Sequence, residues 1–258
     1  MTASASPVMV GPDVPGLDPG TISGQEAEHA LLIVAHGSAR YPEAAGTVLM
    51  HADAIRMSGR FAAVAVGLLN GAPSVADALA SLGPRPIDVV PFFMEDGYFT
   101  RVAVPKALGS AEMRLYPAVG THPGMAKLIL GRTVRAGLAP DTLSLVLVGH
   151  GSARSPGRRM ALHDHAARLR ARFAAVHVAF LEEQPSVKEV LSTIDGPAAV
   201  LGVFAGEGMH VRVDLPALLA AAPGAIDLGS LGDEVGLAAL IADLVLGGSP
   251  PGRTQERP

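Results

Sequence analysis

Short apolar runs alternate with longer amphipathic segments along this chain, and the alternation predicts its fold. Strand-length apolar runs occur at 30–35, 62–69, 87–93, 143–148, 176–181 and 198–204. Segments of helical period follow them at 42–57, 74–82, 101–108, 157–173, 186–194 and from about 211, and a short strand near 226 and a helix over 233–246 come last. This order is typical of parallel βαβ units. It predicts an α/β protein with two three-layer α/β/α domains, each containing a four-stranded parallel sheet.

The prediction of two domains comes from an internal repeat. The segment His36-Gly-Ser-Ala-Arg-Tyr-Pro42 matches His150-Gly-Ser-Ala-Arg-Ser-Pro156 at six of seven positions. Two further matches, 97–105 with 208–216 and the Pro-Ser-Val segments at 73 and 185, lie about 112 residues apart. Three matches in the same order indicate homologous halves. We assign them to 29–138 and 139–247, with flexible tails at 1–28 and 248–258.

The composition narrows the possible functions. The chain has 258 residues, of which 49% are hydrophobic and only 4% aromatic, with a formal net charge of -4. That charge gives no general attraction to nucleic acid or anionic membranes, and no apolar run is continuous enough for a membrane helix. Because the chain contains no Cys, it has no disulfide, thiolate metal site or cysteine nucleophile. We expect a soluble cytoplasmic protein that uses His, Asp and Glu for any metal chemistry.

Three side chains that bind metals or exchange protons follow predicted strands of the second half. They are His150 after the first strand, Glu182 after the second and His210 after the third. Because ligands of open α/β sheets bind at the carboxyl ends of the strands, we expect these three groups to converge. Glu183 is an alternative to Glu182, since successive side chains leaving a strand point in different directions.

Two imidazoles and a carboxylate on a rigid sheet suit a divalent ion such as Fe²⁺, Co²⁺ or Ni²⁺, and they also accept protons. The glycines on either side of His150 allow a bulky ligand to approach the backbone. Arg154, in the same loop, is placed to bind a carboxylate through both of its terminal nitrogens.

The first half lacks the same set. At the positions of Glu182 and His210 it has Asn70 and Phe99, so it keeps only His36. We therefore expect the second half to be active, with Ser38 and Arg40 on the opposite wall of a shared cleft. No functional role is assigned to the other histidines. His122 is interpreted as a turn or cap residue, and solvent exposure is expected for His51, His163, His165 and His177.

These motifs resemble the CbiX/SirB sirohydrochlorin chelatases, which belong to the type II chelatases that include ferrochelatase. The resemblance rests on His150-Gly-Ser, Phe180-Leu-Glu182 and Gly208-Met-His210-Val-Arg-Val-Asp214-Leu-Pro216, and it covers both halves. It implies insertion of Fe²⁺ or Co²⁺ into sirohydrochlorin, a tetrapyrrole with eight carboxylates, for sirohaem or cobalamin synthesis. No organic cofactor is implied.

The resemblance also implies roles for individual residues. His150, Glu182 and His210 would receive the metal and take up the pyrrole protons. Ser152, Arg154, Ser38 and Arg40 would hold the substrate carboxylates. Some two-lobed relatives carry the complete set in the amino-terminal half, so the working half is assigned here by motif and not by position.

Two other functions were weighed against metal insertion. A non-catalytic carrier of a tetrapyrrole or metal would need the cleft and the arginines but not the complete His and Glu set. A serine hydrolase is disfavoured, because Gly149-His-Gly-Ser152 is followed by Ala and Arg and does not form the Gly-x-Ser-x-Gly elbow. The oligomeric state is not predicted.

Overall fold

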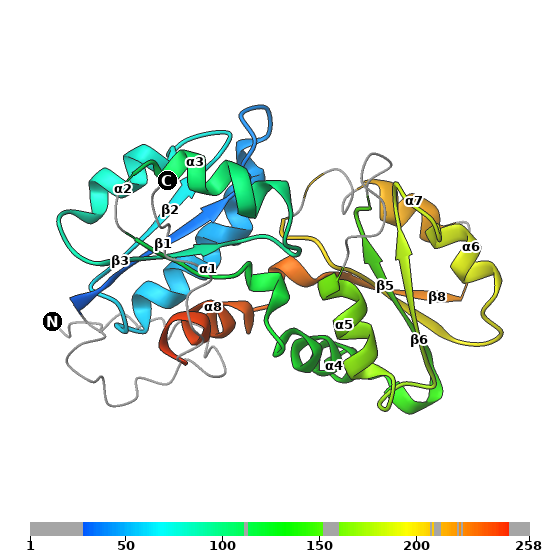
Figure 1. The fold of residues 1–258 in the computed structure, drawn as a ribbon. Helices are drawn as coiled ribbons and strands as arrows, with labels where there is room; N and C mark the ends of the chain where they lie inside the picture. The colour runs from blue at the N-terminus through cyan, green and yellow to red at the C-terminus, as the bar shows by residue number, and fades with distance from the viewer. Residues whose placement is uncertain are drawn as a thin grey trace, which may run out of the picture.

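The computed structural model describes residues 28–110, 113–151, 160–206, 208, 213–220, 222 and 224–247. Over these residues the chain forms two lobes, each with a four-stranded parallel sheet between helices (Figure 1). The strand orders are β2-β1-β3-β4 and β6-β5-β7-β8, so the second sheet repeats the topology of the first. The predicted α/β architecture is confirmed.

Within its described residues, the first half contains four strands and four α-helices. The strands are β1 (Ala30–Ala35), β2 (Ala63–Leu68), β3 (Ile87–Pro91) and the two-residue β4 (Arg114–Leu115). The helices are α1 (Gly46–Met57), α2 (Val75–Leu82), α3 (Val104–Leu108) and α4 (Met125–Arg135). The predicted helix at 101–108 begins two residues earlier, because a π-helical turn over Phe99–Ala103 leads directly into α3.

The second half has the same order. Its strands are β5 (Ser144–Gly149), β6 (Ala175–Phe180), β7 (Ala198–Gly202) and β8 (Ala225–Ser230). Its helices are α5 (Met160–Leu169), α6 (Val187–Ser192), α7 (Leu215–Ala220) and α8 (Leu237–Leu246). The last helix begins later than predicted, since a 3-10 turn over Leu231–Asp233 comes first.

The repeat extends to details of local structure. The helix after the second strand of each half begins with a capping box, Ser74 with Asp77 in one and Ser186 with Glu189 in the other. In both, the serine oxygen accepts the backbone N–H of the third helical residue, whose carboxylate accepts the serine N–H. A cis peptide bond precedes Pro73 and Pro185 at equivalent places. The two halves therefore share these features of local structure.

The last helix of each half packs in the other lobe. Helix α8 packs on α1 and contacts β3, whereas α4 packs on α5, and Figure 1 shows α8 in the lobe of β1–β3. One hydrophobic core runs through both lobes, with members such as Ile33, Leu147 and Ile241. Smaller clusters under α2 and α3 and under α6 and α7 cover the outer faces. Each packed lobe therefore contains one helix from the other half of the repeat, α8 in the first lobe and α4 in the second. The shared core holds the two lobes together.

Two histidines predicted to be exposed are buried where the chain crosses between lobes, so that prediction was wrong. His51 on α1 and His165 on α5 are each 1% exposed. The Nε2 atoms of these two residues lie 2.7 Å from the carbonyl oxygens of Gly232 and Gly120, respectively, just before α8 and α4. Their positions on the inner helix faces were hidden from sequence, because the partner helices come from the opposite half.

Burial has a chemical consequence for both of these histidines. Desolvation lowers the pKa of His51 and of His165, more than the bonded carbonyl raises it. Both rings are therefore held neutral near pH 7, with Nε2–H donating to the glycine carbonyl. In contrast, His163 is exposed as expected and His177 is half-buried.

The predicted turn role of His122 is confirmed. Its Nδ1 accepts the backbone N–H of Gly124 at 3.0 Å, and its Nε2 lies 3.0 Å from an Asp243 oxygen on α8. No helix within the described residues has the length and apolar character needed to cross a membrane.

Candidate functional site

Strand pairing brings the ends of β5 and β6 together and places His150 beside Glu182. The two strands are parallel neighbours in register, with Gly149 opposite Phe180. Beyond them, the backbone N–H of Glu182 donates to the carbonyl of His150 at 3.0 Å. The two candidate side chains therefore leave adjacent strands at the same edge of the sheet, as the sequence predicts.

The side chains of this pair face each other. His150 Nδ1 lies 3.6 Å from Glu182 Oε2 and 3.2 Å from the Gly151 carbonyl oxygen. Both oxygens are acceptors, so a proton on Nδ1 would be stabilised by either of them. The side chains are 48% and 52% exposed, so both are accessible to a ligand from solvent.

Gly151 explains why the loop after β5 can lie so close to the loop after β6. It has a positive φ of 77°, and a Cβ there would lie 2.7 Å from the Cβ of Glu183. A larger residue would clash and would adopt a strained backbone. Glu183 thus packs against Gly151, whereas Glu182 points toward His150, and this geometry supports Glu182 over Glu183 in the candidate site.

A cavity of about 370 Å³ opens next to the pair. It is lined by Leu181, Glu182, Asp214, Ala217 and Leu218, between the end of β6 and the start of α7. Asp214 belongs to the motif that includes His210, but the sequence analysis gave it no role. Its equivalent in the first half is Ala103, so comparison of the repeats gives a signal for it.

Several predicted site residues lie outside the described residues. They are His210, Ser152 and Arg154. The described part of the chain contains no cluster of three or more His, Cys, Asp or Glu side chains arranged to hold a metal. The roles of these three residues stay predictions.

The equivalent place in the first half has the same backbone but different chemistry. The N–H of Asn70 donates to the His36 carbonyl at 2.8 Å, as Glu182 does to His150. The His36 ring, however, lies edge-on against Phe99, with ring centroids 4.7 Å apart. Phe99 occupies the repeat position of His210, so an aromatic ring replaces an imidazole.

The two first-half residues predicted to bind substrate lie in the loop after β1. Ser38 Oγ accepts the backbone N–H of Tyr41 at 3.0 Å, which gives this hydroxyl a role in closing the turn. The Arg40 guanidinium lies 5.3 Å from the centroid of the Tyr41 ring, within range for a cation–π contact. Arg40 is exposed and Ser38 half-buried, and a part in binding substrate stays a prediction for both.

Glu95 links the two halves and was not predicted from the sequence. Its carboxylate, just beyond β3, accepts the backbone N–H groups of Ala161 at 3.2 Å and Leu162 at 2.9 Å. A carboxylate is favoured at this amino-terminal turn of α5 by the unpaired N–H groups and the helix dipole. The equivalent position in the second half is Gly206. The sequence therefore distinguishes Glu95 only as a residue that differs between the two halves.

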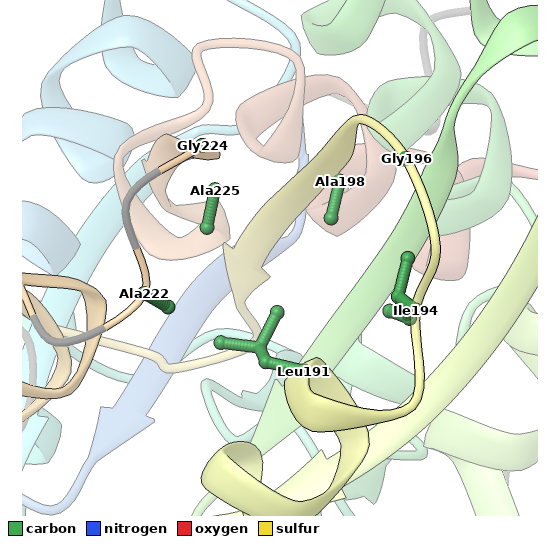
Figure 2. Close-up of a pocket in the computed structure, with 7 residues that line it drawn as sticks. All are labelled: Leu191, Ile194, Gly196, Ala198, Ala222, Gly224 and Ala225. Carbon is green, nitrogen blue, oxygen red and sulfur yellow. The ribbon is translucent and has the colours of Figure 1, made fainter.

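A second cavity lies at the opposite edge of the second sheet. Figure 2 shows its lining, which is formed by Leu191, Ile194, Gly196, Ala198, Ala222, Gly224 and Ala225. Its volume is about 160 Å³, and it opens beside the first residues of β7 and β8. Its side chains are all apolar, and it lies at the amino ends of the strands, away from His150 and Glu182.

Two parallel sheets in tandem, with His and Glu at the carboxyl edge of one, define a chelatase-like protein. The CbiX family model matches residues 30–136 and 144–246, one copy in each half. The chain belongs to the CbiX family, as its motifs predict.

Named proteins that are similar to this chain support the assignment to the CbiX family. A probable sirohydrochlorin cobaltochelatase of Halobacterium salinarum is 30% identical over 220 residues, which cover 72% of this chain and 75% of the relative. The crystal structure of CbiX, described as the terminal enzyme for siroheme biosynthesis in denitrifying bacteria, has a TM-score of 0.67 and 27% identity, covering 85% of this chain and 99% of that one.

Two more structures share the fold. DR2241 from Deinococcus radiodurans, a multi-domain protein with structural similarity to chelatases, has a TM-score of 0.74 and 25% identity over 88% of this chain, which spans only 56% of that protein. SirB from Bacillus subtilis with Fe³⁺ has a TM-score of 0.71 and 18% identity, covering 84% of this chain and 94% of that one, which shows a common fold.

Proposed function

We propose that this chain is a sirohydrochlorin chelatase that inserts Co²⁺ or Fe²⁺ into the macrocycle through its second half. The observation that carries the proposal is the pairing of His150 with Glu182, 3.6 Å apart at the carboxyl ends of β5 and β6. Membership of the CbiX family and the likeness to a named cobaltochelatase support it.

The chemistry needs groups that bind a metal ion and accept protons. Two pyrrole nitrogens must each lose a proton as the dication enters the macrocycle. The imidazole of His150 and the carboxylate of Glu182 are groups of the kinds that accept protons and bind divalent metals. His210 would complete the set in the proposal. The half-exposed pair allows the metal to arrive from solvent before the macrocycle covers it.

The proposal includes both metals, because the relatives' names differ. The Halobacterium relative is named for cobalt and the CbiX structure for siroheme, which contains iron. Imidazole and carboxylate ligands bind both ions, and availability decides between them. Insertion should therefore be measured with each metal in turn.

The test is an anaerobic assay of purified protein with sirohydrochlorin and Co²⁺ or Fe²⁺, followed by the absorption change of the macrocycle. We expect insertion well above the protein-free rate and its loss in His210→Ala. The serine of the His150 loop gives a matched control, since Ser152→Ala should bind substrate less well and still insert metal. If the protein binds sirohydrochlorin but wild type and His210→Ala insert metal no faster than buffer, the chain is a carrier and the proposal is wrong.

A further inference from the structure

Four aromatic rings gather in the first half where the second half has its candidate metal ligands. The Phe99 centroid lies 4.7 Å from that of His36, 5.7 Å from Phe93 and 5.6 Å from Tyr98. Phe93 and Phe99 are nearly parallel, at 12°, and the other two rings meet Phe99 at steep angles. These are the favoured geometries of aromatic pairs, so the cluster is a defined surface. We name these four residues the aromatic platform.

The aromatic platform is open to solvent at its outer side. Phe99 is 40% exposed and Tyr98 is 68% exposed, and Val102 on the next helical turn is 48% exposed. A Phe that had replaced a metal ligand only to fill space would be buried, because burial is what stabilises a large apolar side chain. Exposed aromatic groups gathered in one patch mark a binding surface.

Glu95 holds the aromatic platform next to the second half. It lies four residues before Phe99 in the loop after β3, and it caps the first turn of α5 through Ala161 and Leu162. Helix α5 is the next described element after His150 in the chain. The segment that carries the platform is thereby tied to the helix that follows the candidate metal ligand in sequence.

Positive charges flank the aromatic platform. Arg101 lies two residues after Phe99, is 64% exposed, and its guanidinium lies 3.8 Å from a carboxylate oxygen of Asp96. Arg40 lies in the loop that begins at His36, where it stacks on Tyr41. An apolar aromatic surface with arginines at its margin suits a flat conjugated ring that carries carboxylates on its rim.

We propose that the aromatic platform of the first half binds one face of the macrocycle, so that the half without metal ligands serves as a substrate-binding wall. Phe99 is then a substrate-binding residue that contributes stacking and apolar contact, and the metal enters from the side of His150 and Glu182. This inference rests on the proposed function. It adds contact with the face of the ring to the carboxylate binding predicted for Ser38 and Arg40.

The test compares three substitutions of Phe99 by titrating metal-free sirohydrochlorin and by measuring steady-state insertion of Co²⁺. We expect Phe99→Ala to raise the dissociation constant and the KM about three- to tenfold, the factor for loss of one aromatic contact, with a much smaller change in kcat. Phe99→Trp should bind as tightly as wild type or tighter. Phe99→Leu, which keeps apolar volume without a ring and guards against misfolding, should fall between Ala and wild type.

Met57→Ala is the matched control. Met57 is an apolar side chain, 72% exposed, at the end of α1 near the opposite edge of the sheet, and its loss should leave binding unchanged. If wild type inserts metal and the three Phe99 variants bind sirohydrochlorin as wild type does, the platform inference is wrong and the proposed function stands. If wild type neither binds nor metallates sirohydrochlorin, the proposed function is wrong and the inference falls with it.

Discussion

The two halves of this chain share a backbone and differ in chemistry. Each has a histidine after its first strand whose carbonyl accepts a backbone N–H from the end of the second strand, at 2.8 Å for His36 and 3.0 Å for His150. Around His150 stand a carboxylate and an open cavity, and around His36 stand an amide and an aromatic ring. The fold preserves the backbone positions, so the proposed assignment of metal chemistry to the second half rests on the side chains at the strand ends.

The nine-residue motif after the third strand makes the comparison sharper. Gly, Arg, Val and Pro occupy the same places in 97–105 and 208–216, whereas His210 and Asp214 are replaced by Phe99 and Ala103. In the first half the shared Arg, Val and Pro lie in the π-helical turn Phe99–Ala103 and in α3. His210 is a proposed metal ligand and Asp214 lines the cavity beside Glu182, so the proposed chemistry is confined to the second half.

The largest expected effect separates the two histidines. His150→Ala should lower the rate of metal insertion about 100-fold or more, because it removes a proton acceptor and a metal ligand together. His36→Ala should lower it less than tenfold, through weaker binding of the macrocycle. The measurement is anaerobic insertion of Co²⁺, with circular dichroism as the control for folding. A larger loss in His36→Ala than in His150→Ala would assign the chemistry to the first half.

A second prediction concerns two glycines that pack tightly against the segments that follow β3 and β7. A Cβ at Gly120 would lie 2.2 Å from the Cα of Met94, and one at Gly232 would lie 2.5 Å from the carbonyl oxygen of Phe204. Both neighbours are backbone and cannot move aside. Gly120→Ala and Gly232→Ala should each lower the free energy of unfolding by about 1–3 kcal/mol, which urea titration measures.

The control for this pair is Gly46→Ala at the start of α1. A Cβ there meets nothing within 4 Å, so the substitution should be neutral or stabilising because Ala favours the helix. A loss in Gly46→Ala equal to that in the other two variants would show that the tight contact is not the cause.

The buried histidines predict a dependence of stability on pH that both halves share. Burial lowers the pKa of His51 and His165 from the ordinary value of 6.5. The unfolded chain therefore binds protons below about pH 6.5 that the folded chain does not, and stability falls as the pH decreases from there toward the lower folded pKa values. Each histidine adds at most about 1.4 kcal/mol per pH unit to the slope of the unfolding free energy against pH.

The measurement for the histidines is urea unfolding at several pH values between 7.5 and 5. His51→Gln and His165→Gln keep a donor for the glycine carbonyl but do not titrate, so each should reduce the slope, by similar amounts in the two halves. Among the described residues His165 Nδ1 has no hydrogen-bond partner, so a proton there would be buried unpaired. An unchanged slope in both variants would rule these histidines out as its source.

The smallest expected effect tests whether the halves are equal in local structure. Ser74→Ala and Ser186→Ala each remove the serine of a complete capping box, at the starts of α2 and α6. Each should cost about 1 kcal/mol of unfolding free energy. Similar values for the two variants would support equal local structure, and a loss confined to one half would contradict it.

Much of the fold could be predicted from sequence. Apolar runs such as 30–35, and 143–148 with Ser144 as its one polar residue, form central strands that are almost wholly buried. The repeat also supplies a second copy of each uncertain element. The exchange of α4 and α8 could not be predicted, because both helices have an apolar face and sequence order alone does not say which lobe it covers. For the same reason His51 and His165 were wrongly expected to be exposed.

The part of the site that depends on strand order could be predicted from the sequence. His150 and Glu182 directly follow adjacent parallel strands, so their meeting follows from topology. Glu95 was missed because its partners, the N–H groups of Ala161 and Leu162, come from the other half and carry no side-chain signal. The openness of Phe99 was also hidden, since an aromatic residue in a sequence is expected to be buried.

The most direct test of the account is to locate the metal. Crystals of the protein soaked anaerobically with Co²⁺, without tetrapyrrole, would show the ion by its anomalous scattering. The account predicts a peak at coordination distance, about 2.0–2.2 Å, from His150 and the Glu182 carboxylate, with none beside His36. A peak beside His36 and none at His150 would contradict it.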